Sequence, residues 1–121
     1  MLSAFASPPQ PASPTAQPAT AAAATADQLT ANSRRAYAEV LKLRLGPARD
    51  LLRPELATTP TAPAPLLVAN CADFAELIIT QDAARYEALT GAQEARLTAL
   101  DRAPASALRD YARAEITLQR D

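Results

Sequence analysis

The segment from Pro65 to Gln81 constrains the fold more than any other part of the sequence. It holds the densest group of large apolar residues, namely Leu66, Leu67, Val68, Cys71, Phe74, Leu77, Ile78 and Ile79. Steps of three and four residues place some of them on one face of a helix, and these are Leu67, Cys71, Phe74 and Ile78. The same spacing gathers a polar stripe of Asn70, Asp73, Glu76 and Thr80. The segment therefore predicts a central helix, apolar on most sides, with other helices packed around it.

The rest of the chain offers few large apolar side chains to surround such a helix. Ala accounts for 31 of the 121 residues, whereas Leu, Ile, Val and Phe together number 23. Because Ala buries little area, a domain of this size is expected to be marginally stable. We expect the fold to depend on neighbouring repeats, on a partner, or on more chain than this sequence contains.

The composition argues against most kinds of catalytic and cofactor site. The chain has no His, which is the commonest general base and metal ligand, and its single Cys71 can form neither an internal disulfide nor a Cys-based zinc site. Cys71 lies on the apolar face of the central helix, so we interpret it as a buried, inert thiol. No His or suitable Lys is available to activate a Ser or Thr, and Gly46 and Gly91 do not form a phosphate-binding loop. We predict no enzyme activity and no cofactor.

Residues 1–26 differ from the rest of the chain. They include five prolines and many Ala, Ser and Thr residues, and they carry no charged side chain. Such a segment cannot bury enough apolar surface to offset its conformational entropy, so a disordered leader is predicted. Ala4-Phe5-Ala6 has the small-x-small form of a signal-peptidase site, but the basic and apolar regions of a signal peptide are missing. Either the match is due to chance, with a cytoplasmic protein, or Met1 is an internal start and the protein is exported.

From Asp27 to Asp121 the pattern predicts helices joined by short turns. A first helix is expected from Asp27 to Leu45, with Tyr37 on its apolar face and Gly46 as its C-terminal cap. A second is expected from Pro47 to Ala57, with a kink or an early end at Pro54. After the central helix, Asp82 is predicted to cap a short helix that ends at Leu89. Thr90 and Gln93 have capping-box spacing, which predicts a separate helix from Gly91 to Leu100.

Pro104 is predicted to open a final helix, which has no closing signal before Asp121. Its residues at helical spacing are Leu108, Tyr111, Ala112, Glu115 and Leu118. The predicted fold is thus all-α: antiparallel helical hairpins in a right-handed, repeat-like stack behind a disordered leader. The open final helix is compatible with a chain truncated at its C-terminus.

A tetratricopeptide-like register fits the first hairpin. Ala36 takes the small position of the first helix of the repeat, Ala48 and Leu52 take the small and large positions of the second, and Pro60 takes the terminal proline. Asn32, Arg35 and Glu39 depart from the motif, which has large apolar or aromatic residues there.

Three stretches of the sequence resemble the N-terminal part of certain bacterial tetratricopeptide-repeat-like proteins of unassigned function. They are Asn70-Cys71-Ala72-Asp73-Phe74, then Arg96-Leu97 with Leu100-Asp101, and Tyr111-Ala112-Arg113-Ala114-Glu115-Ile116-Thr117-Leu118-Gln119. The resemblance covers about residues 36–119. It implies an α-solenoid fragment from an exported chain that continues further, and it supplies no active-site residues.

Two groups of residues are candidates for a binding surface. The polar stripe of Asn70, Asp73 and Glu76 could hydrogen-bond a partner or bind a hard cation together with Glu115. The simpler interpretation is a set of ion pairs, in which Arg49 or Arg53 reaches Asp73 or Glu76 when the first hairpin packs on the central helix. The other group lies on the last helix and consists of Leu108, Tyr111 and Leu118, which would bind a protein or peptide partner or the remainder of a longer repeat chain if exposed.

The function that the sequence favours is a non-enzymatic structural or protein-interaction module. One alternative is a nucleic-acid-binding domain that uses the six basic residues between Arg34 and Arg53. The net charge of −1 and the lack of interleaved aromatic residues disfavour it. The other alternative is a carboxylate metal-binding helical protein, which the absence of His disfavours. No membrane span is expected, because the apolar run of the central helix is short and carries Asp73 and Glu76.

Overall fold

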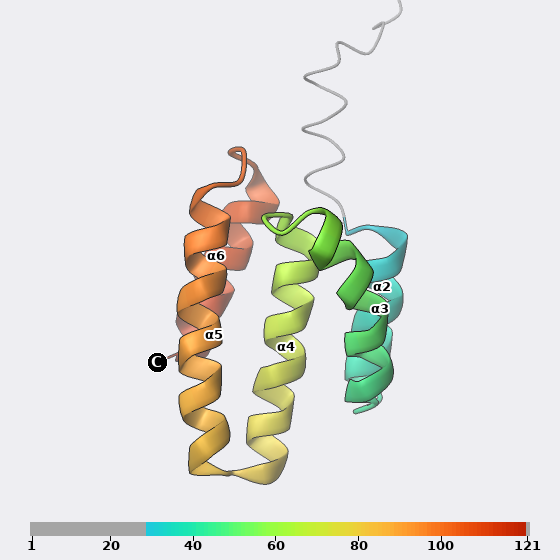
Figure 1. Ribbon diagram of the computed structural model, residues 1–121, viewed down its shortest axis with the longest axis vertical. Coiled ribbons are helices and arrows are strands. Elements are labelled where there is room, and N and C mark those ends of the chain that lie inside the picture. Colours follow the sequence, from blue (N-terminus) through green and yellow to red (C-terminus); the bar gives the residue numbers. More distant parts are fainter. Residues whose placement is uncertain (1–28, 121) are drawn as a thin grey trace, which may run out of the picture.

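The computed structural model describes residues 29–120, and all regular secondary structure in this range is helical (Figure 1). The helices are α2 (Ala31–Leu41), α3 (Leu45–Thr58), α4 (Pro63–Thr80), α5 (Ala83–Asp101) and α6 (Ala107–Arg120). The expectation of an all-α fold built around a central helix over the segment from Pro65 to Gln81 is confirmed. The predicted leader over residues 1–26 and the Ala4-Phe5-Ala6 motif lie outside the described residues.

Helix α4 is the centre of the structure, and each of the other four helices packs against it. The α2–α3 hairpin lies on one side of α4, and α5 and α6 lie on the other (Figure 1). The N-terminal half of α4, residues 63–70, is buried all round. Burial of its large apolar side chains favours folding by about 25 cal/mol per Å² of apolar surface.

Two apolar clusters flank α4, one against each half of the fold. The cluster shared with α2 and α3 comprises Ala36, Val40, Ala48, Leu52, Val68, Ala69 and Ala72. The cluster shared with α5 and α6 comprises Leu66, Leu67, Leu100, Ala112 and Ile116. Ala36, Ala48 and Leu52, the residues of the tetratricopeptide-like register, are all buried in the first cluster. The small side chains of Ala36 and Ala48 let the helix backbones approach closely.

The turn between α2 and α3 differs from the predicted one. Helix α2 begins at Ala31 after its N-cap Thr30 and ends at Leu41, so the predicted bounds of Asp27 and Leu45 were wrong. Lys42, and not the predicted Gly46, caps the C-terminus of α2, and Leu43 follows it in the left-handed conformation with a φ of 61°. Gly46 and Pro47 instead form the first turn of α3, where the missing N–H of proline costs no helical hydrogen bond. Helix α3 continues through Pro54 to Thr58 and does not end early.

The predicted break between two short helices at Thr90 was also wrong, because α5 is continuous from Ala83 to Asp101. The Thr90 hydroxyl donates a hydrogen bond to the carbonyl of Tyr86, 3.0 Å away, and so does not act as a helix cap. A glycine inside a helix costs about 1 kcal/mol relative to alanine. Burial of Leu89 and Leu100 on either side of Gly91 offsets that cost. The predicted N-cap at Asp82 is confirmed, since its side chain accepts from the backbone N–H of Ala84 at 2.9 Å.

The distal part of α4 is less buried than its sequence predicted. Phe74 is half-buried, whereas Ile78 and Ile79 are exposed. The reason is that the last turns of α4 and the first turns of α5 extend beyond the end of the α2–α3 hairpin, so the hairpin does not cover them (Figure 1). By length and composition alone, α4 is long and apolar enough to cross a membrane. Its Asp73 and Glu76, however, are ion-paired to neighbouring helices. These contacts are those of a core helix.

Helix α6 begins at Ala107, not at Pro104 as predicted. The Ser106 hydroxyl accepts a hydrogen bond from the backbone N–H of Arg109 at 3.0 Å at the start of this helix. Ala112 and Ile116 are buried in the core, while Tyr111 and Leu118 are exposed. The packing of α6 on α4 and α5 therefore decides which of its residues can contact a partner.

Candidate functional site

The polar stripe on α4 forms an ion-pair network. One carboxylate oxygen of Asp73 accepts from the Arg49 guanidinium of α3 at 2.9 Å, and the other accepts from Arg96 of α5 at 2.5 Å. Glu76 accepts from Arg49 at 2.7 Å through one oxygen and pairs with Arg85 through the other. The predicted pairing of Arg49 with Asp73 and Glu76 is therefore confirmed.

Arg49 joins the two carboxylates of α4 to α3. Its burial lowers its pKa, whereas its hydrogen bonds and electrostatic attraction to Asp73 and Glu76 raise it, and the net shift of the Arg49 pKa is upward. The arginine is therefore a permanent cation in this network. Arg53 does not take part, because it pairs with Asp50 on the surface of α3.

Asn70 extends the network to α6. This buried side chain accepts from Arg96 at 3.0 Å and donates to the side-chain oxygen of Gln119 at 2.5 Å. Gln119 in turn donates to Glu115 at 3.1 Å. The stripe thus links α4 to α3, α5 and α6, and its members satisfy one another's hydrogen-bonding groups.

These contacts leave the stripe poorly suited to a cation. All four carboxylate oxygens of Asp73 and Glu76 already face an arginine. Glu115 interacts with Gln119 and does not complete a carboxylate cluster with them. Among residues 29–120 there is no group of three His, Cys, Asp or Glu side chains placed to hold a metal ion. We therefore interpret the stripe as a structural network.

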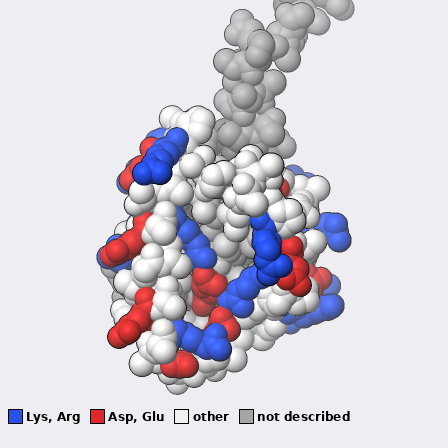
Figure 2. Space-filling model, viewed as in Figure 1, with Lys and Arg blue, Asp and Glu red and all other residues white. Residues whose placement is uncertain are grey.

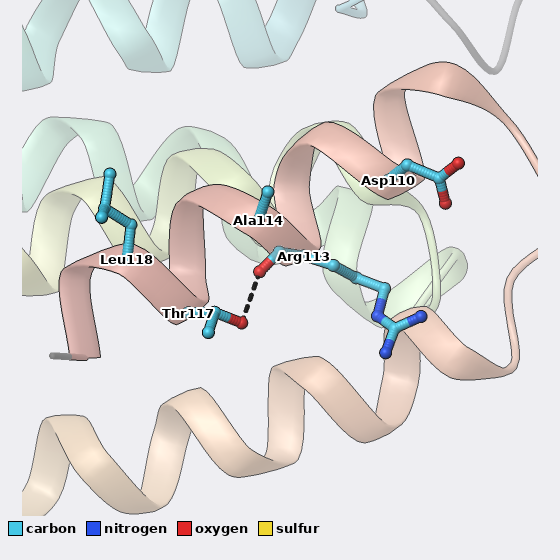
Figure 3. Close-up of a pocket in the computed structure, with 5 residues that line it drawn as sticks. All are labelled: Asp110, Arg113, Ala114, Thr117 and Leu118. Carbon is cyan, nitrogen blue, oxygen red and sulfur yellow. Dashed lines mark hydrogen bonds between the residues drawn. The ribbon is translucent and has the colours of Figure 1, made fainter.

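The three α6 residues predicted to bind a partner do not form one patch. Leu108 is half-buried against the second apolar cluster. Leu118 lines a shallow, open pocket of about 560 Å³ (Figure 3). The residues that line this pocket all belong to α6, namely Asp110, Arg113, Ala114, Thr117 and Leu118. In Figure 3, Ala114 and Leu118 point away from α5, while Arg113 points toward it and pairs with Asp101 at 3.3 Å. A pocket lined by a single helix encloses little of a ligand.

Tyr111 belongs to a more enclosed hollow, which we call the α2/α6 groove. This groove has a volume of about 250 Å³ and runs across α4 between α2 and α6. Its lining consists of Leu29, Tyr37, Leu67, Val68, Cys71, Tyr111 and Glu115. Leu67, Val68 and Cys71 come from α4 and form the floor, while α2 and α6 each contribute a tyrosine. Tyr37, predicted to lie in the core, is 40% exposed and lines this groove instead.

The thiol of Cys71 lies in this groove and is half-buried. Burial raises the pKa of Cys71, and the negative charge of Glu115 raises it further, while Gln119 and Arg96 oppose the shift. The thiol is therefore neutral near pH 7 and a poor nucleophile. This agrees with the predicted inert thiol, although the side chain is less buried than expected.

The basic residues between Arg34 and Arg53 do not form an uninterrupted positive surface. Arg44 pairs with Glu39 at 3.1 Å, Arg53 pairs with Asp50, and Arg49 is held in the α4 network. Figure 2 shows positive and negative side chains interleaved over the face in view. A nucleic-acid backbone would need a continuous positive track, so this observation does not favour a nucleic-acid interface.

Sequence reasoning found Tyr111 but missed the residues that face it. Tyr37 and Cys71 were each assigned to apolar helix faces, and spacing along one helix cannot tell a core face from a groove. The groove exists because α2 and α6, distant in sequence, both pack on α4. Comparisons of the chain with protein-family models, curated proteins and solved structures find no match.

Proposed function

We propose that this chain is a non-enzymatic protein-interaction module of the tetratricopeptide-like helical-repeat type, which holds an extended peptide in the α2/α6 groove. The observation that carries this proposal is the groove itself: an apolar floor between two exposed tyrosines, with one carboxylate at its edge. Tyrosine is enriched at protein interfaces because its ring is apolar and its hydroxyl can hydrogen-bond.

The order in which the helices pack supports the repeat-like part of the proposal. Helices α2 and α3 form one hairpin, α4 and α5 form a second, and α6 packs against both helices of the second; in the proposed repeat order α6 takes the place of the first helix of a further unit. Helix α4 contacts α2 and α6, the first helices of the adjacent units, as well as α3 and α5. In a helical-repeat array, each unit contacts its neighbours through such pairings. The first helices of successive units would then line one surface, and the α2/α6 groove lies on it.

The size of the groove favours a peptide over a small metabolite. Pockets for small ligands usually enclose about 300–1,000 Å³ and bury most of the ligand. At about 250 Å³, open to solvent and flanked by exposed tyrosines, the groove suits one or two side chains of a chain that continues on both sides. No charged group lies on its floor, so the expected ligand is largely apolar at its centre.

The experiment is selection of binders from a displayed library of random peptides against the full chain, followed by fluorescence anisotropy. Tyr111→Ala should weaken the selected peptides by about tenfold, as expected for a contact worth more than 1 kcal/mol. The matched control is Tyr86→Ala, because Tyr86 and Tyr111 are both 56% exposed and Tyr86 does not line the groove.

Two results would contradict the proposal. One is equal loss of affinity in the Tyr86 and Tyr111 variants. The other is a selection that yields no peptide with a dissociation constant below about 1 mM, which corresponds to about 4 kcal/mol of binding free energy. Circular dichroism of each variant establishes that the helices remain folded.

A further inference from the structure

We propose that the proline-rich segment Pro8–Pro18 of this same chain binds in the α2/α6 groove and occupies it until a partner peptide displaces it. This inference rests on the proposed function, because it names the ligand class of the same groove. Three observations lead to it: the chemistry of the groove, the spacing of the prolines, and the place where the segment joins the folded residues.

The groove has the chemistry that proline-rich peptides require. Such peptides adopt the extended polyproline II conformation and dock into grooves lined by aromatic side chains. Tyr37 and Tyr111 line the groove from α2 and α6, and Leu67 and Val68 provide apolar contacts beneath them. Within residues 29–120, neither tyrosine hydroxyl has a hydrogen-bond partner. Each can therefore donate to the backbone carbonyls of a polyproline II chain, which has no internal hydrogen bonds.

The prolines of the segment have the period of that conformation. Pro8, Pro11 and Pro14 recur every three residues. A polyproline II helix has three residues per turn and rises about 3.1 Å per residue, so these prolines would lie along one edge, about 9 Å apart. Pro9 and Pro18 fall outside this series. The segment carries no charge, which matches the uncharged floor of the groove.

The attachment point makes the interaction effectively intramolecular. Leu29, the first described residue, itself lines the groove. The residues between Pro14 and Leu29 can span up to about 50 Å, whereas a domain of this size has a radius of gyration of about 12 Å. A tether of this length gives an effective concentration on the order of 1 mM. Even an intrinsic dissociation constant of about 0.1 mM would then keep roughly nine-tenths of the grooves occupied.

The single cysteine of the chain reports on occupancy, because Cys71 lies on the groove floor. The experiment measures the labelling rate of the Cys71 thiol by a disulfide reagent in the native full chain. We expect the triple variant Pro8→Ala, Pro11→Ala and Pro14→Ala to label at least threefold faster than the unaltered chain. The matched control, Pro9→Ala with Pro18→Ala, should label at the unaltered rate. A synthetic peptide of residues 7–19 should slow labelling of the triple variant again.

The outcomes separate this inference from the proposed function. Equal labelling rates for the unaltered chain and the triple variant overturn the self-binding. If the synthetic peptide still slows labelling in that case, the groove binds proline-rich peptides supplied from elsewhere, and the proposed function stands. A labelling rate that falls with protein concentration assigns the bound segment to a second copy and overturns the intramolecular form. If neither the synthetic peptide nor any library-selected peptide protects Cys71, the proposed function fails as well.

Discussion

Replacing Asp73 with alanine tests whether the α4 network holds the two halves of the fold together. Asp73 bridges Arg49 of α3 and Arg96 of α5, so its removal breaks an ion pair on each side of α4. The Asp73 side chain is 25% exposed, and those of its partners are 35% and 15% exposed. The network is therefore neither fully buried nor on the open surface.

The expected loss of unfolding free energy follows from this intermediate burial of the network. Removing one partner of a buried ion pair costs about 3–5 kcal/mol, whereas an exposed pair contributes about 0–1 kcal/mol. We expect Asp73→Ala to reduce the free energy of unfolding by about 2–3 kcal/mol. A domain of this size is stable by roughly 5–13 kcal/mol, and each kcal/mol shifts its Tm by about 4–8 °C. The Tm should fall by about 10–20 °C.

The assay is urea and thermal unfolding followed by circular dichroism, with Asp50→Ala as the control. Asp50 pairs with Arg53 on the surface of α3, where both side chains are largely exposed, so its loss should cost less than about 0.5 kcal/mol. A double-mutant cycle of Asp73→Ala with Arg96→Met should give a coupling energy above about 1 kcal/mol. The reasoning is refuted if the Asp73 and Asp50 variants are equally stable, or if the cycle shows no coupling.

Three further predictions test the core, the continuity of α5 and the buried thiol. Leu100→Ala should lower the free energy of unfolding by about 2–5 kcal/mol because Leu100 is fully buried, while the exposed Leu41→Ala should change it by less than about 0.5 kcal/mol; chemical denaturation measures both. Gly91→Ala should stabilise the chain by about 0.5–1 kcal/mol in the same assay, since Gly91 lies inside α5 with a negative φ and open space around it. Destabilisation would instead indicate the helix break at Thr90 and Gly91 that the sequence pattern predicted. Burial raises the pKa of Cys71 in the folded state, so the stability that the neutral thiol contributes is complete below the ordinary thiol pKa and is lost as the pH rises through the raised value. The unaltered chain should therefore lose more stability between about pH 8 and pH 10 than Cys71→Ala, and parallel pH profiles of the two proteins would contradict this.

The sequence by itself determined the central helix and the pairing of its acids with an arginine of the first hairpin, whereas the pairing with Arg85 and Arg96 of α5 appears only in the tertiary structure. A dense apolar run with a polar stripe can bury itself only as a helix surrounded by other elements, and α4 over Pro63–Thr80 follows from that pattern. The acids of this run and the arginines of the first hairpin have opposite charges, so packing the two together brings Arg49 to Asp73 and Glu76. These features depend on local periodicity and on charge, which a sequence records directly.

Only the tertiary structure decided where the helices end and which side chains face solvent. Thr90 and Gly91 carry a local signal for a break, but packing of the flanking residues keeps α5 continuous. Ile78 is exposed because its helix extends past the α2–α3 hairpin, a difference in length that no periodicity reveals. The α2/α6 groove likewise depends on how two helices distant in sequence sit on α4. Which face of a helix meets a neighbour is a property of the whole assembly, because each face is buried or exposed by elements that local sequence does not describe.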